Sequence, residues 1–291
     1  MPTASNTACS SMLAKSSMDE RLITKSRLVS DLVRLGLRAG DLVMLHASVK
    51  AVGWIVGGPD VVLEAIVDIL GSTGTLMMYV GSEDSMYHAS EWPDGKKRAY
   101  LEELAPYDPM RTRACREWSI LTEYLRTWPG AFRSAHPDGS FAAVGALADW
   151  ITKDHPIDYG YGPGSPPAKL VEARGKVLLL GSPLECVTLL HHAEHLADVP
   201  EKLVVKYPAP VLRDGKRILI DIEEFDTSTG IPGYPDEDYF VSIVREFIAN
   251  GNGSSGNVGC GKSYLFDAES LCRHAVEWLE RTPRVERTNP I

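Results

Sequence analysis

The fold class is decided by residues 41–80, DLVMLHASVKAVGWIVGGPDVVLEAIVDILGSTGTLMMYV. An apolar run at 41–49 is followed by a glycine-containing loop and by a helical pattern at 59–70, with Pro59 in its first turn and Gly71 beyond its end. The apolar run at 75–80 then resumes as a strand. A strand, a helix and a strand in this order predict a βαβ unit with parallel strands and a right-handed crossover.

The flanking sequence extends this pattern. Strand-like runs occur at 141–145 (FAAVG) and 176–181 (KVLLLG), and leucines at helical spacing predict a helix from residue 24 to Gly40. Two further strand-like runs surround Asp214-Gly215, which is a strong hairpin signal. We therefore expect a three-layer α/β/α fold around a central mixed, largely parallel sheet, with an added β-hairpin.

The domain organisation is predicted from composition. Residues 1–22, rich in Ser, Thr and Ala, predict a disordered tail, 23–282 a single domain, and 283–291 a C-terminal tail. The polar, proline-broken stretch 81–109 predicts a long loop, and the glycine-rich stretch 250–261 a mobile one.

Charge and cysteine content exclude several classes of protein. The 39 acidic and 30 basic side chains give a net charge of −9, which disfavours nucleic acid as a partner and favours a small cation. Five scattered cysteines suit reduced thiols rather than a disulfide framework. No apolar run approaches the roughly 20 residues of a membrane span, so we expect a cytoplasmic protein with no membrane partner. A homodimer is compatible with the sequence, which does not fix the oligomeric state.

The richest chemistry lies in residues 181–200, GSPLECVTLLHHAEHLADVP, directly after a predicted strand. A helix starting near Pro183 places Thr188, His191 and Glu194 on one stripe, and His192 about 100° away from it. A carboxylate beside an imidazole makes it a better base. The alternative is that this His and Glu simply face solvent.

Two motif matches compete with this interpretation. His191, Glu194 and His195 form H-x-x-E-H, the zinc motif of inverzincin metallopeptidases, although no third ligand is evident. Residues 256–263 match the Walker A pattern, but no strand precedes them and a strand-like run follows. The loop at 46–60 is a better anion site, because its glycines, Lys50 and the following helix could all face a phosphate.

Three separated motifs carry a family resemblance: LHASVKAVG at 45–53, FRSAHPDGSFAAVG at 132–145 and VTLLHHAEHLADVP at 187–200. Together they resemble the aminoglycoside 3-N-acetyltransferases, and the similarity extends from about residue 25 to residue 280. The resemblance implies transfer of an acetyl group from the cosubstrate acetyl-CoA to the 3-amino group of a deoxystreptamine antibiotic, an activity that confers antibiotic resistance.

The resemblance also implies roles for particular residues. His191 would be the general base in a ternary complex, Glu194 would support it, and Thr188 would donate to the developing oxyanion or the departing sulfur. No metal is implied, so the zinc and Walker matches become accidental. The residues implied to lie against coenzyme A are His46, Ser48, Lys50, Val52, Gly53 and Ser140.

A polycationic acceptor requires an acidic pocket, because each ammonium that loses water needs a carboxylate partner. The candidate substrate-binding residues are Tyr79, Glu83, Asp84, Glu123, Glu223, Glu224 and Asp226. Two other functions remain open: acetylation of a different small amine, and sequestration of aminoglycosides without modification.

Overall fold

A computed structural model of the protein describes residues 22–89, 92–234 and 238–284. The tails predicted at 1–22 and 283–291 fall almost wholly outside the described residues. That one domain spans 23–282 stays a prediction. Within the described ranges no helix combines the length and the apolar character needed to cross a membrane.

The central sheet is built of seven described strands in the order β3-β4-β2-β1-β5-β9-β8. Their bounds are β1 Leu42–Ala47, β2 Thr75–Tyr79, β3 Phe132–Arg133, β4 Phe141–Gly145, β5 Lys176–Leu180, β8 Ser254–Val258 and β9 Gly261–Asp267.

Strand β1 lies at the centre, parallel to β2 on one side and to β5 on the other. Met44 of β1 pairs with Met77 and with Val177, which fixes the register of the three strands. The remaining neighbouring pairs of described strands are antiparallel. The predicted βαβ unit and mixed sheet are confirmed, but parallel pairing is confined to the three central strands.

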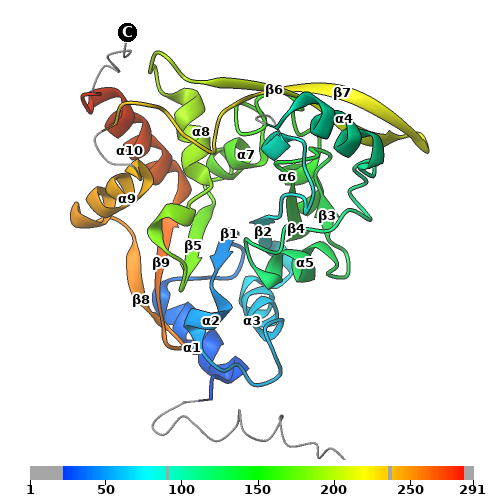
Figure 1. Ribbon diagram of the computed structural model, residues 1–291. Coiled ribbons are helices and arrows are strands. Elements are labelled where there is room, and N and C mark those ends of the chain that lie inside the picture. Colours follow the sequence, from blue (N-terminus) through cyan, green and yellow to red (C-terminus); the bar gives the residue numbers. More distant parts are fainter. Residues whose placement is uncertain (1–21, 90–91, 235–237, 285–291) are drawn as a thin grey trace, which may run out of the picture.

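Helices cover both faces of this sheet (Figure 1). Helices α1, α3 and α5 share one apolar cluster with the sheet, and α6 to α10 share the other. Their bounds are α1 Lys25–Leu35, α2 Val49–Val52, α3 Val61–Leu70, α4 Asp94–Glu103, α5 Ile120–Arg126, α6 Ala148–Thr152, α7 Pro166–Glu172, α8 Leu189–Leu196, α9 Tyr239–Ala249 and α10 Ala268–Arg281.

The two apolar layers follow from the period of two along each strand. In β5, Val177 and Leu179 face the cluster containing α8 and α10, whereas Leu178 and Leu180 face the cluster containing α1 and α3. All four side chains are fully buried, as expected for a strand covered on both faces. The three-layer α/β/α arrangement is confirmed.

The predicted hairpin is also confirmed, as β6 Val204–Arg213 paired with β7 Lys216–Phe225 in a separate two-stranded sheet. Asp214 and Gly215 both adopt positive φ, 51° and 72°, as the tight turn requires. The hairpin packs on the segment that contains α4 and extends across one end of the molecule (Figure 1).

Several sequence-based predictions of helix bounds and loops are wrong. The first helix ends at Leu35 rather than Gly40, because Gly36 takes a left-handed φ of 119° and caps it. The loop expected at 250–261 contains strand β8, which pairs with β9 at the edge of the sheet. The stretch 81–109 contains α4 and so is not one long loop.

Candidate active site

A cleft of about 400 Å³ opens at the carboxyl ends of the three parallel strands. Strand β1 contributes His46, β2 contributes Tyr79, and the segment after β5 contributes Ser182. The loop after β2 and the hairpin strands β6 and β7 complete the walls. This is the edge of the sheet at which α/β proteins generally bind ligands.

Helix α8 brings the predicted stripe to this cleft. It begins at Leu189 rather than near Pro183, because residues 184–186 form a separate 3₁₀ turn. Thr188 immediately precedes the helix, and both Thr188 and His191 line the cleft. The structure therefore brings these two side chains together.

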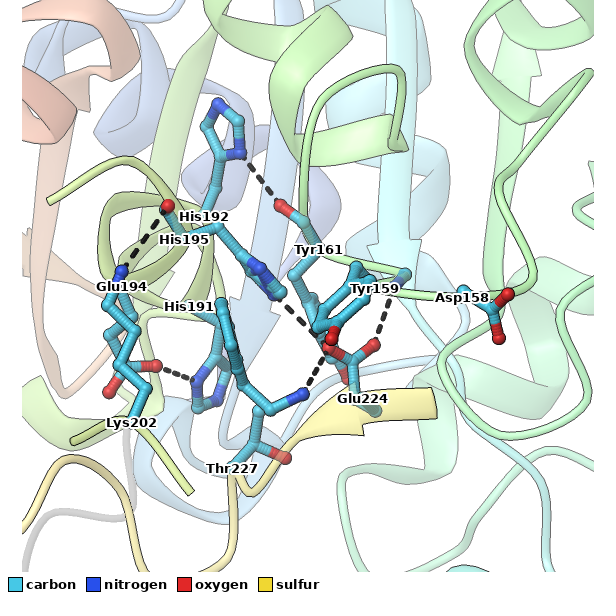
Figure 2. A network of polar contacts seen from close by, with 12 residues as sticks. Asp158, Tyr159, Tyr161, His191, His192, Glu194, His195, Lys202, Glu224 and Thr227 are labelled. Atoms are coloured by element: carbon cyan, nitrogen blue, oxygen red, sulfur yellow. Dashed lines mark hydrogen bonds and ion pairs between the residues drawn. The ribbon is translucent and has the colours of Figure 1, made fainter. Parts of the chain in front are cut away.

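His191 and Glu194 are in direct contact (Figure 2). The Nδ1 atom of His191 lies 2.8 Å from Oε2 of Glu194. The imidazole is 21% exposed and the carboxylate only 6%. An ionised carboxylate can only accept, so Nδ1–H donates to it and leaves Nε2 of a neutral imidazole free to take a proton.

His192 points away from this pair, as predicted. Its Nδ1–H donates to the backbone carbonyl of Tyr161, 2.7 Å away, and the side chain is buried (Figure 2). It does not line the cleft, so its contact is structural.

Aromatic rings hold the imidazole of His191 in place. Its ring centroid lies 5.1 Å from that of Tyr161 and 4.9 Å from that of Phe240. Next to Phe240 in the chain, Tyr239 is buried and donates its hydroxyl to Oε1 of Glu194. Each oxygen of the carboxylate thus has its own donor.

His46 lies at the base of the cleft, at the end of β1. Burial and, to a smaller extent, the nearby His191 lower the pKa of this imidazole to about 4. Its Nε2 atom is buried and has no hydrogen-bond partner among the described residues. His46 is therefore neutral at physiological pH, with one nitrogen available to a ligand.

Glu224 supplies a buried carboxyl to the cleft wall. Backbone N–H groups of Gly160 and Phe225 donate to its two oxygens. Burial nevertheless raises its pKa to about 7, because an ion is costly where water is excluded.

His195 faces Glu224 and not His191 (Figure 2). Its Nε2 lies 3.2 Å from Oε1 of Glu224, and burial lowers the pKa of the imidazole to about 3. His191 and His195 therefore turn toward different partners, which breaks the H-x-x-E-H geometry. Across the described part of the chain, no three His, Cys, Asp or Glu residues are grouped so as to hold a metal ion.

The other acidic candidates lie outside the cleft. Glu83 and Asp84 line a neighbouring cavity of about 230 Å³. Glu123 pairs with Arg113 and Arg126, which lowers the pKa of its carboxyl to about 2 against the opposing effect of burial. The structure does not bring these side chains to the pair formed by His191 and Glu194.

Glu223 and Asp226 are likewise held by protein groups. Glu223 pairs with Lys206 and accepts from the hydroxyl of Tyr159. Asp226 accepts from Tyr87, Ser228 and Thr229, and these hydrogen bonds outweigh burial and lower its pKa to about 2. Asp226 thereby shapes the loop whose next residues, 227 and 228, line the cleft.

Most residues implied to contact coenzyme A lie outside the cleft lining; His46 is the exception. Ser48 accepts from the N–H of Ala51 at the start of α2, and Val52 and Ser140 are fully buried. Lys50 is exposed, and Gly53 turns the chain after α2 with a φ of 109°. Their predicted contact with the cosubstrate stays a prediction.

The Walker A match lies in an antiparallel hairpin. Residues 256–263 run from β8 through a tight turn at Gly259 into β9. A phosphate-binding loop must instead lead from a strand into a helix. The expectation that no strand precedes the motif is wrong, because β8 leads into it, but the segment that follows is strand β9 and not a helix.

Several residues in or next to the cleft were missed by sequence reasoning. Tyr161 and Phe240 pack on His191, and Tyr239 donates to Glu194. Asp138 and Trp118 add an acidic and an aromatic group to the wall. No local periodicity marks them, because segments far apart in the chain bring them together; only the aromatic pair Tyr239-Phe240, at the start of α9, offered a signal.

The fold and the cleft together define an α/β enzyme in which a glutamate-supported histidine can take a proton from a bound substrate. The family profile described as aminoglycoside 3-N-acetyltransferase matches residues 44–280. The chain is 50% identical over 258 residues to the aminoglycoside N(3)-acetyltransferase III of Pseudomonas aeruginosa, covering 88% of this chain and 93% of that relative. The protein therefore belongs to the aminoglycoside 3-N-acetyltransferase family, and the resemblance expected from its motifs is confirmed.

Solved structures support the same assignment. A structure described as AAC-IIIb binary with CoASH has a TM-score of 0.85 and 44% identity, covering 91% of this chain and 100% of that one. Another, AAC-VIa bound to sisomicin, has a TM-score of 0.85 and 36% identity, covering 89% of this chain and 98% of that one. The predicted class, an acetyl-CoA-dependent N-acetyltransferase, is confirmed.

Proposed function

We propose that the protein acetylates the 3-amino group of deoxystreptamine antibiotics in a ternary complex with acetyl-CoA, with His191 as the general base. One observation carries this proposal: the cleft-facing imidazole of His191 is backed by the buried carboxylate of Glu194, 2.8 Å away. The relatives named above are acetyltransferases of this substrate class. Resistance to the antibiotic would follow from its modification.

The base is needed because an ammonium has no lone pair with which to attack a thioester. Nε2 of His191 takes a proton from the amine as the nitrogen bonds to the acetyl carbon. Glu194 then faces an imidazolium rather than a neutral ring, which favours the proton transfer. The ammonium has by then released one proton to solvent. As the C–S bond breaks, the imidazolium returns the second proton to the thiolate, and the products are the amide and free coenzyme A.

Thr188 is the proposed donor to the charge that develops on the acetyl oxygen or on the departing sulfur. It lines the cleft one helical turn before His191 and is largely buried. A hydroxyl held where water is excluded stabilises a developing anion more strongly than the same group in water.

The acceptor is proposed to bind against Glu224 and Tyr79. Both line the cleft, and Glu224 offers the acidic side chain that an ammonium requires. Its neighbours Thr227 and Ser228 add hydroxyl groups that can bond to a sugar. The thioester of acetyl-CoA would enter past His46, and the reaction would take place in the cytoplasm, where acetyl-CoA is formed.

The test is an assay of free thiol released from acetyl-CoA with kanamycin-, gentamicin- and neomycin-type acceptors. Mass spectrometry of the recovered antibiotic should show one added acetyl group, which sequestration would not produce. His191→Ala should lower kcat by about 100-fold or more. His192→Asn, which alters the adjacent histidine outside the cleft, should have a far smaller effect; equal losses, or no turnover with any acceptor, would overturn the proposal.

A further inference from the structure

The second oxygen of Glu194 is held by a residue outside the predicted stripe. Oε2 contacts His191, and Oε1 accepts the hydroxyl proton of Tyr239 at the start of α9. The last side-chain torsion of a glutamate has a broad distribution, so a single hydrogen-bond partner does not fix the plane of its carboxylate. Two donors on opposite oxygens do fix it.

The hydroxyl of Tyr239 is itself anchored. It accepts from the backbone N–H of Ile231, 2.9 Å away, while donating to Glu194. Linked hydrogen bonds of this kind polarise one another, so the donation to Glu194 is strengthened. Burial raises the pKa of the Tyr239 hydroxyl, and the charge on Glu194 raises it further, which keeps the hydroxyl protonated.

Consecutive residues therefore serve the two halves of the catalytic pair. Tyr239 bonds to the carboxylate, and the ring of Phe240 lies 4.9 Å from the ring of His191. The same segment is joined through Ile231 to the loop that lines the cleft at residues 227 and 228. The first two residues of α9 thus contact both His191 and Glu194.

We propose that Tyr239 is a positioning residue of this reaction: its hydroxyl orients Glu194 and limits how strongly that carboxylate attracts the proton on His191. This inference rests on the proposed function. A carboxylate that accepts a hydrogen bond holds less uncompensated charge. Without Tyr239, Glu194 would lose its second donor and would hold the Nδ1 proton of His191 more strongly.

Other titratable side chains surround His191 and Glu194 and could affect the same measurements. His46 and Tyr161 approach the imidazole from the sheet and from the loop before α7. The remaining titratable neighbours are His195 on α8, Lys202 before β6, and Tyr234 before α9. Tyr239→Phe retains all of these side chains. The matched control removes only the hydroxyl of Tyr234.

The test compares Tyr239→Phe with Tyr234→Phe. Both tyrosines are buried, their rings are 4.9 Å apart, and Tyr234 donates instead to the carbonyl of Leu279, 2.6 Å away. Y239F should lower kcat about tenfold and leave KM for acetyl-CoA within about twofold of wild type. Y234F should leave both constants unchanged.

Histidine NMR gives a readout that does not need turnover. The Nδ1–H proton of His191 is donated to Glu194, so its resonance reports how strongly that carboxylate accepts it. The resonance should move downfield in Y239F and stay in place in Y234F, even if the acceptor assignment were wrong. Difluorotyrosine at position 239, which keeps the ring and makes the hydroxyl a stronger donor, should move the resonance upfield. The same resonance in wild type, Y239F and the difluorotyrosine protein would overturn the inference, whereas absent turnover with a shifted resonance would count only against the proposed function.

Discussion

Oε1 of Glu224 lies 3.2 Å from Nε2 of His195, with both side chains 4% exposed. Burial pushes the two pKa values in opposite directions, to about 7 for the carboxyl and about 3 for the imidazole. Near pH 7 the pair therefore carries one negative charge or none. A cation that binds against Glu224 favours the ionised form.

We accordingly expect acceptor binding to release protons. Affinity for the aminoglycoside should rise as the pH increases through about 7, because the ionised carboxylate is the binding form. Calorimetry in buffers of different ionisation enthalpy should detect the release in wild type and a smaller one in Glu224→Gln. Asp221→Asn, an exposed change on the same strand, should behave as wild type. Equal proton release in all three proteins would remove Glu224 from the binding site.

Glu194→Gln should lower kcat by about 10- to 100-fold, because a neutral amide no longer stabilises the imidazolium that forms on His191. KM for acetyl-CoA should change little, since Glu194 lies behind the base and not in the cleft lining. Steady-state kinetics with both substrates varied would check this. Glu246→Gln on α9, which loses only contacts with Arg281 and His274, is the matched control.

Asp226→Asn should raise KM for the acceptor by about three- to tenfold, because the donors on Asp226 order the loop that presents Thr227 and Ser228 to the cleft. Turnover at saturation should be nearly kept. A loss confined to kcat would contradict this positioning role.

The same variant tests a pH effect on stability. The pKa of Asp226 is lowered to about 2, so its stabilisation is present above the unfolded value near 4 and is lost as the pH falls through 2. After allowance for partial exposure, the difference in unfolding free energy between wild type and D226N should be on the order of 1 kcal/mol at pH 7. It should disappear by about pH 2, as measured by urea unfolding.

Lys262→Met should leave acetyl transfer unchanged. Nζ of Lys262 donates to Ser255 within the β8–β9 hairpin, 3.1 Å away, far from the arrangement that a nucleotide phosphate requires. Neither wild type nor K262M should hydrolyse ATP. ATP hydrolysis lost in K262M would revive the Walker interpretation.

The parts of the fold that local pattern controls could be predicted from the sequence. The run at 75–80, the helix closed by Gly71 and the Asp214-Gly215 turn each carry their signal within a few residues. Strand β8 could not be predicted, because its Ser- and Gly-rich sequence resembles a loop and it is a strand only by pairing with β9.

In the site, too, contacts within one helix could be predicted from the sequence, and contacts between distant segments could not. His191 and Glu194 are three residues apart on one helix, so their contact follows from helical geometry. The partner of Glu194 is 45 residues away in the chain, and no spacing rule connects them. Acidic residues could be counted but not placed: Glu224 is in the cleft, whereas Glu123 is held by two arginines elsewhere.

The two-stranded hairpin is a structurally separate part of the cleft wall. Strands β6 and β7 form their own sheet, yet they provide Tyr207 and Glu224 to the wall of the cleft, while the base sits on a helix packed against the central sheet. With the acceptor against Glu224 as proposed, substitutions in the hairpin would change the wall that the acceptor meets and leave unaltered the helix that carries His191.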